Sequence, residues 1–168
     1  TNPSLVFRNM AATDVGEVLA LEREIYPQPW SEGIFLDELG RSDRVYIVAV
    51  DAGDEIVGFA GLMLVDVDGH VTTLAVRPQD RFAGLGTQLM LELVQAGLDM
   101  GARNLTLEVR STNTGAQRLY EKFGMSAVGV RKHYYRDDDA VIMWATEIDQ
   151  AEYGQRLAGI RAELEGQS

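Results

Sequence analysis

Residues 74–87, LAVRPQDRFAGLGT, hold the clearest structural pattern in this chain. An apolar run ends before Pro78, which cannot continue a central strand, and a short loop then leads to Gly84 and Gly86. The two glycines open a helical pattern with one apolar face, formed by Leu85, Leu89, Leu93 and Ala96. The N–H groups and the positive dipole end at such a helix start bind anions, and glycine lets a phosphate approach the backbone closely. The stretch therefore predicts a strand, a phosphate-binding loop and a helix in direct succession.

A Gly-x-Gly pair is weak evidence when it stands alone. The third glycine of a dinucleotide-binding fingerprint and the Gly-Lys-Ser/Thr of a P-loop are both missing here. The informative pattern is Arg-x-x-Gly-x-Gly, from Arg81 to Gly86, placed between a strand and an amphipathic helix. The alternative interpretation is a glycine-rich turn that binds no ligand.

Periodicity and turn residues predict further elements on both sides of this stretch. Strands are expected at residues 5–8, 45–50, 56–65, 70–76, 104–109, 125–135 and 140–147. Helices are expected at residues 12–26, after Ser31, at 84–100 and from Asn113 to Phe123. The order β-α-α-β-β-β-α-β-α-β-β predicts an α/β (mixed α+β) fold, with a single mixed central sheet of about seven strands and helices on its faces.

The 168 residues are expected to form one domain, residues 1–148, followed by an extension, residues 149–168. The extension predicts a short amphipathic C-terminal helix, with one apolar stripe formed by Tyr153, Leu157, Ile160 and Leu164. One stripe is enough to dock a helix but not to build a core. We therefore expect truncation after Gln150 to leave binding at the phosphate loop intact.

Composition argues against several classes of protein. Asp and Glu number 26 against 15 Lys and Arg, and the resulting net charge of −11 does not suit binding of nucleic acid through its phosphates. This charge suits cationic partners, or serves solubility alone. The longest uncharged apolar run, residues 56–65, is far shorter than the roughly 20 residues of a membrane span, and residues 1–10 lack the pattern of a secretory signal. With no cysteine there is no disulfide framework, and we expect a cytoplasmic protein.

Metal chemistry is not expected either. His70 and His133 are the only histidines, too few for a zinc site in a chain without cysteine. His70 stands at the start of a predicted strand, where we expect it to make a local hydrogen bond. The acidic residues 137–139 are interpreted as a solvated turn.

At this point the sequence resembles a known family. Arg-x-x-Gly-x-Gly in this element order is similar to the acetyl-CoA pyrophosphate loop of GNAT-fold N-acetyltransferases. LEVRSTN at 107–113 and AQRLYEKFGM at 116–125 resemble the strand-loop-helix of that fold. YPQPWS at 26–31 and RKHYY at 131–135 resemble bacterial ribosomal-protein N-alpha-acetyltransferases of the RimI type. The resemblance covers residues 4–147 and leaves the tail without a counterpart.

The resemblance implies a role for each matching position, with acetyl-CoA as the cofactor. The strand backbone that pairs with the pantetheine arm corresponds to Leu74, Ala75 and Val76. The pyrophosphate loop corresponds to Arg81, Phe82, Ala83, Gly84, Leu85, Gly86 and Thr87. Asn113 and Tyr120 would contact the cofactor near its thioester, with Glu108 as the base and Tyr120 as the acid. The implied acceptor is a protein N-terminus, most simply that of a basic small-subunit ribosomal protein.

The residues support these roles independently of the family. Acetyl transfer from a thioester to an amine needs a base for the amine and a proton for the departing thiolate. Glu108 is the one acidic residue in an apolar strand, on the face opposite Leu107 and Val109, although it could simply face solvent. Tyr120 shares a helix face with core residues and could be only a core tyrosine. Asn113 could be only a helix cap.

Four aromatic residues are candidates for binding the acceptor. They are Tyr26, Trp30, Tyr134 and Tyr135, which fall beside the loops that flank the acceptor groove in the family, although core packing is the alternative. Two rival functions stay open: a GNAT enzyme acting on a small amine, and a non-catalytic CoA-binding partner protein. The peptide-facing segments argue against the first, and the presence of both Glu108 and Tyr120 argues against the second.

Overall fold

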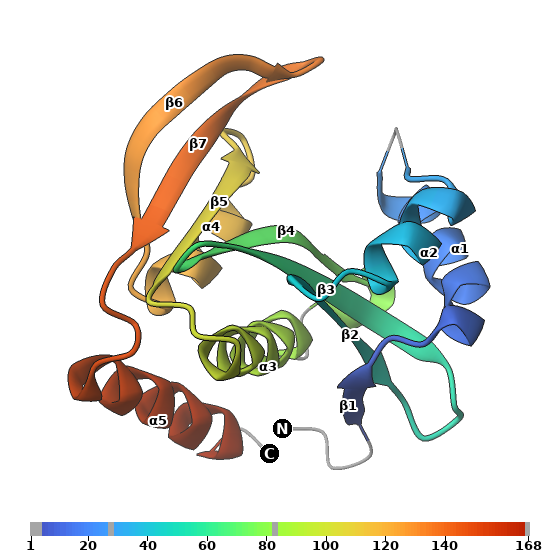
Figure 1. The fold of residues 1–168 in the computed structure, drawn as a ribbon, viewed down its shortest axis with the longest axis horizontal. Helices are drawn as coiled ribbons and strands as arrows, with labels where there is room; N and C mark the ends of the chain where they lie inside the picture. Colours follow the sequence, from blue (N-terminus) through green and yellow to red (C-terminus); the bar gives the residue numbers. More distant parts are fainter. Residues whose placement is uncertain (1–4, 27–28, 82–83, 167–168) are drawn as a thin grey trace.

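The computed structural model describes residues 5–26, 29–81 and 84–166. One seven-stranded sheet runs through them in the order β1-β2-β3-β4-β5-β7-β6 (Figure 1). Its strands are β1 (Val6–Asn9), β2 (Arg44–Val50), β3 (Ile56–Val65), β4 (Asp68–Val76), β5 (Asn104–Arg110), β6 (Ser126–Tyr135) and β7 (Asp138–Ala145). All neighbours are antiparallel except β4 and β5, so the predicted α/β class with a single mixed sheet is confirmed.

The helices begin and end close to the predicted positions. They are α1 (Val15–Ile25), α2 (Glu32–Leu39), α3 (Leu85–Asp99), α4 (Thr114–Lys122) and α5 (Ala151–Gly166), with short 3-10 turns at Ala12–Asp14 and Pro78–Asp80. Ser31 caps α2, because its Oγ accepts a hydrogen bond from the Ile34 N–H at 3.3 Å. Asn113 caps α4 in the same way, through the Ala116 N–H at 3.1 Å. None of the helices within the described ranges has the length and apolar character needed to cross a bilayer.

Two hydrophobic cores cover the two faces of the sheet. The larger core joins the sheet to α3, α4 and α5, and the smaller one joins it to α1 and α2 (Figure 1). Strand alternation divides β2 between them: Ile47 and Ala49 belong to the larger core, whereas Tyr46 and Val48 belong to the smaller. Each helix layer therefore approaches the sheet from its own side.

The strands β4 and β5 separate along their length, and this separation positions the site. Their described pairing covers Asp68–Asn104, Gly69–Leu105 and His70–Thr106, at the start of both strands. Residues 71–76 then continue alongside β3 while β5 turns away to pair with β7 (Figure 1). Because β5 has departed, the edge of β4 at residues 71–76 faces open space instead of a neighbouring strand.

The predicted C-terminal helix is present as α5 and is part of the larger core. Its stripe is buried there, formed by Tyr153, Leu157, Ile160 and Leu164. The Tyr153 hydroxyl donates a hydrogen bond of 2.6 Å to the Phe123 carbonyl, just after α4. The division of the chain at residue 148 into a domain and an extension stays a prediction.

Candidate active site

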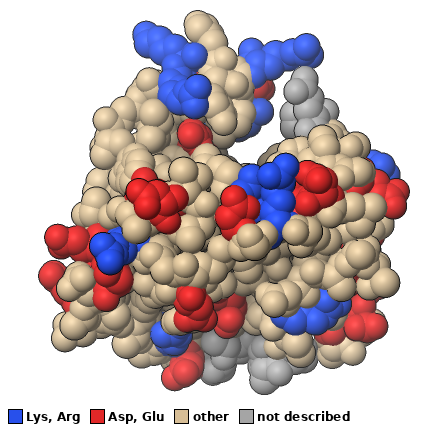
Figure 2. Space-filling view, viewed as in Figure 1, with Lys and Arg blue, Asp and Glu red and all other residues tan. Residues whose placement is uncertain are grey.

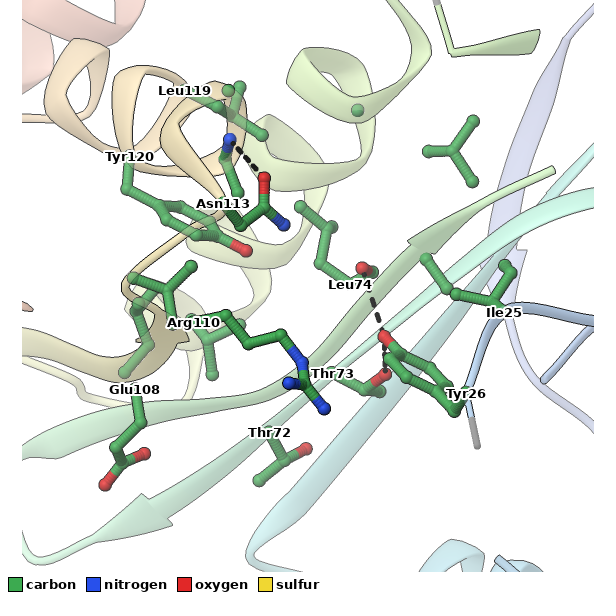
Figure 3. Close-up of a pocket in the computed structure, with 18 of the residues that line it drawn as sticks. Ile25, Tyr26, Thr72, Thr73, Leu74, Glu108, Arg110, Asn113, Leu119 and Tyr120 are labelled. Carbon is green, nitrogen blue, oxygen red and sulfur yellow. Dashed lines mark hydrogen bonds between the residues drawn. The ribbon is translucent and has the colours of Figure 1, made fainter. Parts of the chain in front are cut away.

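A cleft of about 1350 Å³ opens where β4 and β5 separate (Figure 3). Its walls come from α1, β4, the start of α3, β5, α4 and the β6–β7 hairpin. The predicted site residues that line it are Tyr26, Trp30, Leu74, Ala75, Val76, Arg81, Gly84, Gly86, Thr87, Glu108, Asn113, Tyr120, Tyr134 and Tyr135. The side chain of Leu85 instead lies in the larger core, so this residue can offer only its backbone to a ligand. Phe82 and Ala83 lie outside the described residues.

Glu108 occupies the face of β5 that the alternation predicts. Leu107 and Val109 are buried beneath the strand, whereas the Glu108 side chain stays 18% exposed on the opposite face. Its Oε2 lies 2.7 Å from Nε2 of His70, and its Oε1 lies 3.9 Å from Nη1 of Arg131. The carboxylate is therefore held from both sides.

The expectation of a local hydrogen bond for His70 was wrong. His70 pairs with Thr106 across the parallel strands, and Glu108 lies two residues further along β5 on the same face. This register brings the imidazole to the carboxylate. In the sequence, both residues stand out as polar side chains within apolar strands. The register between the two strands, which brings them together, cannot be read from the sequence.

Tyr120 comes from the other side of the sheet. It projects from α4 and belongs to the larger core together with Leu107 and Val109, the face opposite Glu108. Burial raises the pKa of its phenol well above the usual value, and the nearby Tyr26 and Tyr135 act in the same direction. Among the described residues nothing hydrogen-bonds its hydroxyl, which lines the cleft near Asn113 (Figure 3). A protonated hydroxyl and a carboxylate thus meet one cleft from opposite faces.

The α1–α2 segment contributes two aromatic rings to the cleft. The Tyr26 hydroxyl lies 3.3 Å from Thr73 Oγ1 and donates a 3.4 Å hydrogen bond to the Leu74 carbonyl on the open edge of β4 (Figure 3). Trp30 lines the cleft and also packs on Phe35 at 5.0 Å between ring centroids, and its role in binding the acceptor stays a prediction.

Glu22 is a cleft residue that the sequence analysis missed. It is buried on α1, and its Oε2 accepts a 3.1 Å hydrogen bond from the backbone N–H of Trp30. Burial raises the pKa of this carboxyl above its usual range. The sequence did indicate this residue, because Glu22 lies on the apolar face of α1 and a carboxylate buried there needs a hydrogen-bond partner.

The β6–β7 hairpin forms the opposite wall. The Tyr135 hydroxyl donates a 3.3 Å hydrogen bond to the Glu108 carbonyl, and burial raises the pKa of this tyrosine to about 12. The Arg110 guanidinium lies over the Tyr135 ring, 4.4 Å from its centroid, and Arg131 lies similarly over Tyr134 at 4.6 Å. The two contacts of Tyr135 attach the hairpin to β5, whereas the contact between Arg131 and Tyr134 lies within β6.

The acidic residues of this hairpin are bonded instead of merely solvated. Asp137 pairs with Arg110, Asp138 accepts hydrogen bonds from the hydroxyls of Ser111 and Thr112, and Asp139 accepts one from the His133 N–H. Asp138 and Asp139 also belong to β7, so the turn is shorter than predicted. The carboxylates of Asp137 and Asp138 tie the hairpin to the end of β5 and to the loop after it, whereas the carboxylate of Asp139 bonds within the hairpin.

The loop-helix junction has the geometry of an anion site. Gly84 stands before α3 with φ of +74°, a left-handed conformation that favours glycine, and the first N–H groups of the helix have no acceptor within it. Gly86 differs, because a Cβ built on it would meet Leu119 Cδ2 at 3.7 Å and Val76 Cγ2 at 3.9 Å, both ordinary contacts. The fold itself therefore has room for a methyl group at Gly86, which lines the cleft.

Comparison with known proteins places this geometry in a family. The chain matches the Acetyltransferase (GNAT) family over residues 15–125. It is 36% identical over 141 residues to a Bacillus subtilis protein provisionally named [ribosomal protein bS18]-alanine N-acetyltransferase, covering 83% of this chain and 93% of that protein. It is 32% identical over 152 residues to an N-alpha-acetyltransferase of Sulfurisphaera tokodaii, covering 82% and 90%. The crystal structure of the ribosomal-protein-S18-alanine N-acetyltransferase from Escherichia coli matches with a TM-score of 0.77 and 27% identity, over 85% of this chain and 94% of that chain.

Two parallel strands separate in the sheet, and a helix that begins at a glycine starts at the gap. Together with these relatives, this arrangement identifies the fold of an acyltransferase. The chain belongs to the Acetyltransferase (GNAT) family, and it is an N-acetyltransferase. The predicted resemblance to the RimI type is confirmed by the same matches.

Proposed function

We propose that this protein transfers the acetyl group of acetyl-CoA to the α-amine of a protein N-terminus, by direct attack in a ternary complex. The observation that carries the proposal is the opposed placement of Glu108 and Tyr120 in one cleft, on the two faces of the parted sheet. The chain has no cysteine to carry an acetyl group between the two substrates, which favours direct transfer.

The residues around the cleft fit acetyl-CoA. The open edge of β4 at Leu74, Ala75 and Val76 offers backbone groups to the pantetheine arm, and the start of α3 at Gly84, Gly86 and Thr87 offers N–H groups to the pyrophosphate. Arg81 stands beside them, with its Nε 3.4 Å from the Val76 carbonyl. Asn113 and Tyr120 border the same cleft where the thioester, the source of the acetyl group, would lie.

Two protons have to move as the new N–C bond forms and the C–S bond breaks. Glu108 accepts one proton from the amine, directly or through water, and His70 holds the carboxylate in place through Oε2. Tyr120 donates the other proton to the departing sulfur, since a phenol is protonated at neutral pH and burial raises the pKa of this one further. In these roles Glu108 and Tyr120 are catalytic residues and His70 is a positioning residue.

The acceptor enters between the α1–α2 segment and the hairpin. Tyr26 and Trp30 stand on one wall and Tyr134 and Tyr135 on the other, where they can hold the first peptide units behind the amine. An α-amine has a pKa of about 7.7–8.0 against about 10.4 for lysine, so its neutral fraction at neutral pH is a few hundred times larger. A single carboxylate base therefore suits an α-amine better than a lysine side chain, because more of the α-amine is already neutral.

The protein target is proposed from the relatives, whose names specify the alanine terminus of ribosomal protein bS18. The charge of the protein does not select this target. The net charge is −11, but Arg131, Lys132 and Arg136 are exposed around the β6–β7 turn, where Figure 2 shows Lys and Arg gathered. A cytoplasmic location and a basic ribosomal acceptor belong to this same proposal. No observation favours the small-amine or the non-catalytic alternative.

Replacing Gly86 with alanine is expected to weaken acetyl-CoA binding at least tenfold without lowering the melting temperature. The free fold has room for the methyl group, and alanine is favoured over glycine in a helix by about 1 kcal/mol. A loss of affinity must then come from the ligand's approach to the backbone. Calorimetric titration with CoA, together with thermal unfolding, checks this. Gly159→Ala in α5 is the control, because a Cβ there meets nothing within 4 Å and Gly159 does not line the cleft. Unchanged CoA affinity in the Gly86 variant would show that the pyrophosphate does not bind at this loop.

The acceptor class is tested with one peptide in two forms. The first has a free alanine N-terminus and no lysine, and the second has a blocked N-terminus and one internal lysine. We expect the first form to be acetylated at least 100-fold faster at pH 7, because of its larger neutral amine fraction. Mass spectrometry of the products after short incubation with acetyl-CoA gives both rates. Faster acetylation of the lysine form, or of spermidine offered alone, would overturn the proposed acceptor but not the use of acetyl-CoA.

A further inference from the structure

The end of α5 reaches the start of the phosphate-binding helix. A Cβ built on Gly84 would lie 3.3 Å from Cδ2 of Leu164, so the leucine methyl group packs closely on the glycine. Leu164 is 6% exposed and lies in the larger core. The contact joins the last turns of the chain to the residue that opens α3.

The helix that carries Leu164 is itself firmly attached. Near its start, the Tyr153 hydroxyl donates a 2.6 Å hydrogen bond to the Phe123 carbonyl, and Nη1 of Arg156 donates one of 3.2 Å to the Lys122 carbonyl. Leu157 and Ile160 are buried along the same stripe. Because α5 is held along its length, Leu164 presents a fixed surface to Gly84.

Gly84 needs such a surface. Glycine occupies left-handed and right-handed conformations with similar ease, so a φ of +74° is not maintained by the residue itself. The N–H groups at the start of α3 point at a phosphate only while Gly84 keeps this conformation. A side chain packed on Gly84 limits its alternative conformations and keeps the start of α3 ordered before the ligand arrives.

We propose that α5 is a buttress for the cofactor site, in which Leu164 is a positioning residue for pyrophosphate binding. The proposal rests on the proposed use of acetyl-CoA. It reverses the expectation drawn from the apolar stripe, that truncation after Gln150 leaves binding at the phosphate loop intact. It also concerns a segment outside the family match, which ends at residue 125.

Leu164→Ala is expected to weaken CoA binding about five- to thirtyfold, the equilibrium equivalent of ordering one residue's backbone. The matched control is Leu157→Ala, which truncates an equally buried leucine about 10 Å earlier along α5. Both variants are expected to lose stability, whereas the control keeps the CoA affinity of the parent chain. Leu164→Met, which keeps a long apolar side chain, is expected to restore binding.

The donor substrate gives a readout that general destabilisation would not. S-acetylpantetheine lacks the pyrophosphate, so kcat/KM with this donor should be unchanged by Leu164→Ala while kcat/KM with acetyl-CoA falls. Linkage also requires the reverse effect: CoA should slow amide hydrogen exchange in α5 of the parent chain. This last measurement needs no variant, so it applies even if Leu164→Ala fails to fold.

The outcomes separate the inference from the function on which it rests. Parent chain that binds no CoA would overturn the proposed cofactor, and the buttress with it. Parent chain that binds CoA, with equal losses in Leu164→Ala and Leu157→Ala or unaltered exchange in α5, would overturn the buttress alone.

Discussion

Replacing Tyr120 with phenylalanine is expected to slow the acetyl-transfer step by about 10²–10⁴-fold, the usual contribution of a general acid. The ring stays in the larger core and the hydroxyl has no described partner to leave unpaired, so the fold should be retained. CoA affinity should change little. Single-turnover measurements with an alanine-terminal peptide separate the chemical step from binding and product release.

Tyr153→Phe is the matched control for this change. Tyr153 is 7% exposed against 8% for Tyr120, but its hydroxyl bonds the Phe123 carbonyl outside the cleft. Losing that hydrogen bond should cost about 0.5–1.5 kcal/mol of stability and leave the rate of transfer unchanged. A Tyr120 variant with the rate of the parent chain would show that the sulfur receives its proton elsewhere.

Glu108→Gln is expected to lower kcat/KM by about 10²–10⁴-fold at pH 6.5 to 7. Glutamine keeps the shape of the side chain and can still contact His70, but it cannot accept the proton of the amine. The deficit should shrink as the pH rises past about 8, because the α-amine then loses its proton to solvent. The rate against pH, measured for both proteins, gives this comparison.

The control for charge removal is Glu38→Gln. Glu38 has 15% side-chain exposure against 18% for Glu108, and it bonds Arg44 and Tyr46 away from the cleft. Its substitution should affect stability but not the pH profile. If kcat/KM of Glu108→Gln is lowered by the same factor at every pH, this carboxylate holds the site in place instead of accepting a proton.

Local patterns in the sequence predicted much of the fold. The alternation of β5 put Leu107 and Val109 in the core and Glu108 on the opposite face, because successive side chains of any strand point to opposite sides. Ser31 and Asn113 began helices because their side chains satisfy N–H groups only a few residues away. Such interactions close over short distances along the chain, so their residues can be identified without knowing the rest of the molecule.

The tertiary structure alone decided which distant residues meet. His70 reaches Glu108 through the register of two parallel strands joined by a long crossover, and a shift of one residue would turn the imidazole to the other face. Leu164 reaches Gly84 because α5 packs in the larger core, which its apolar stripe predicted without naming a partner. Register and docking depend on how all the apolar surfaces pack together, and no short stretch of sequence contains that information.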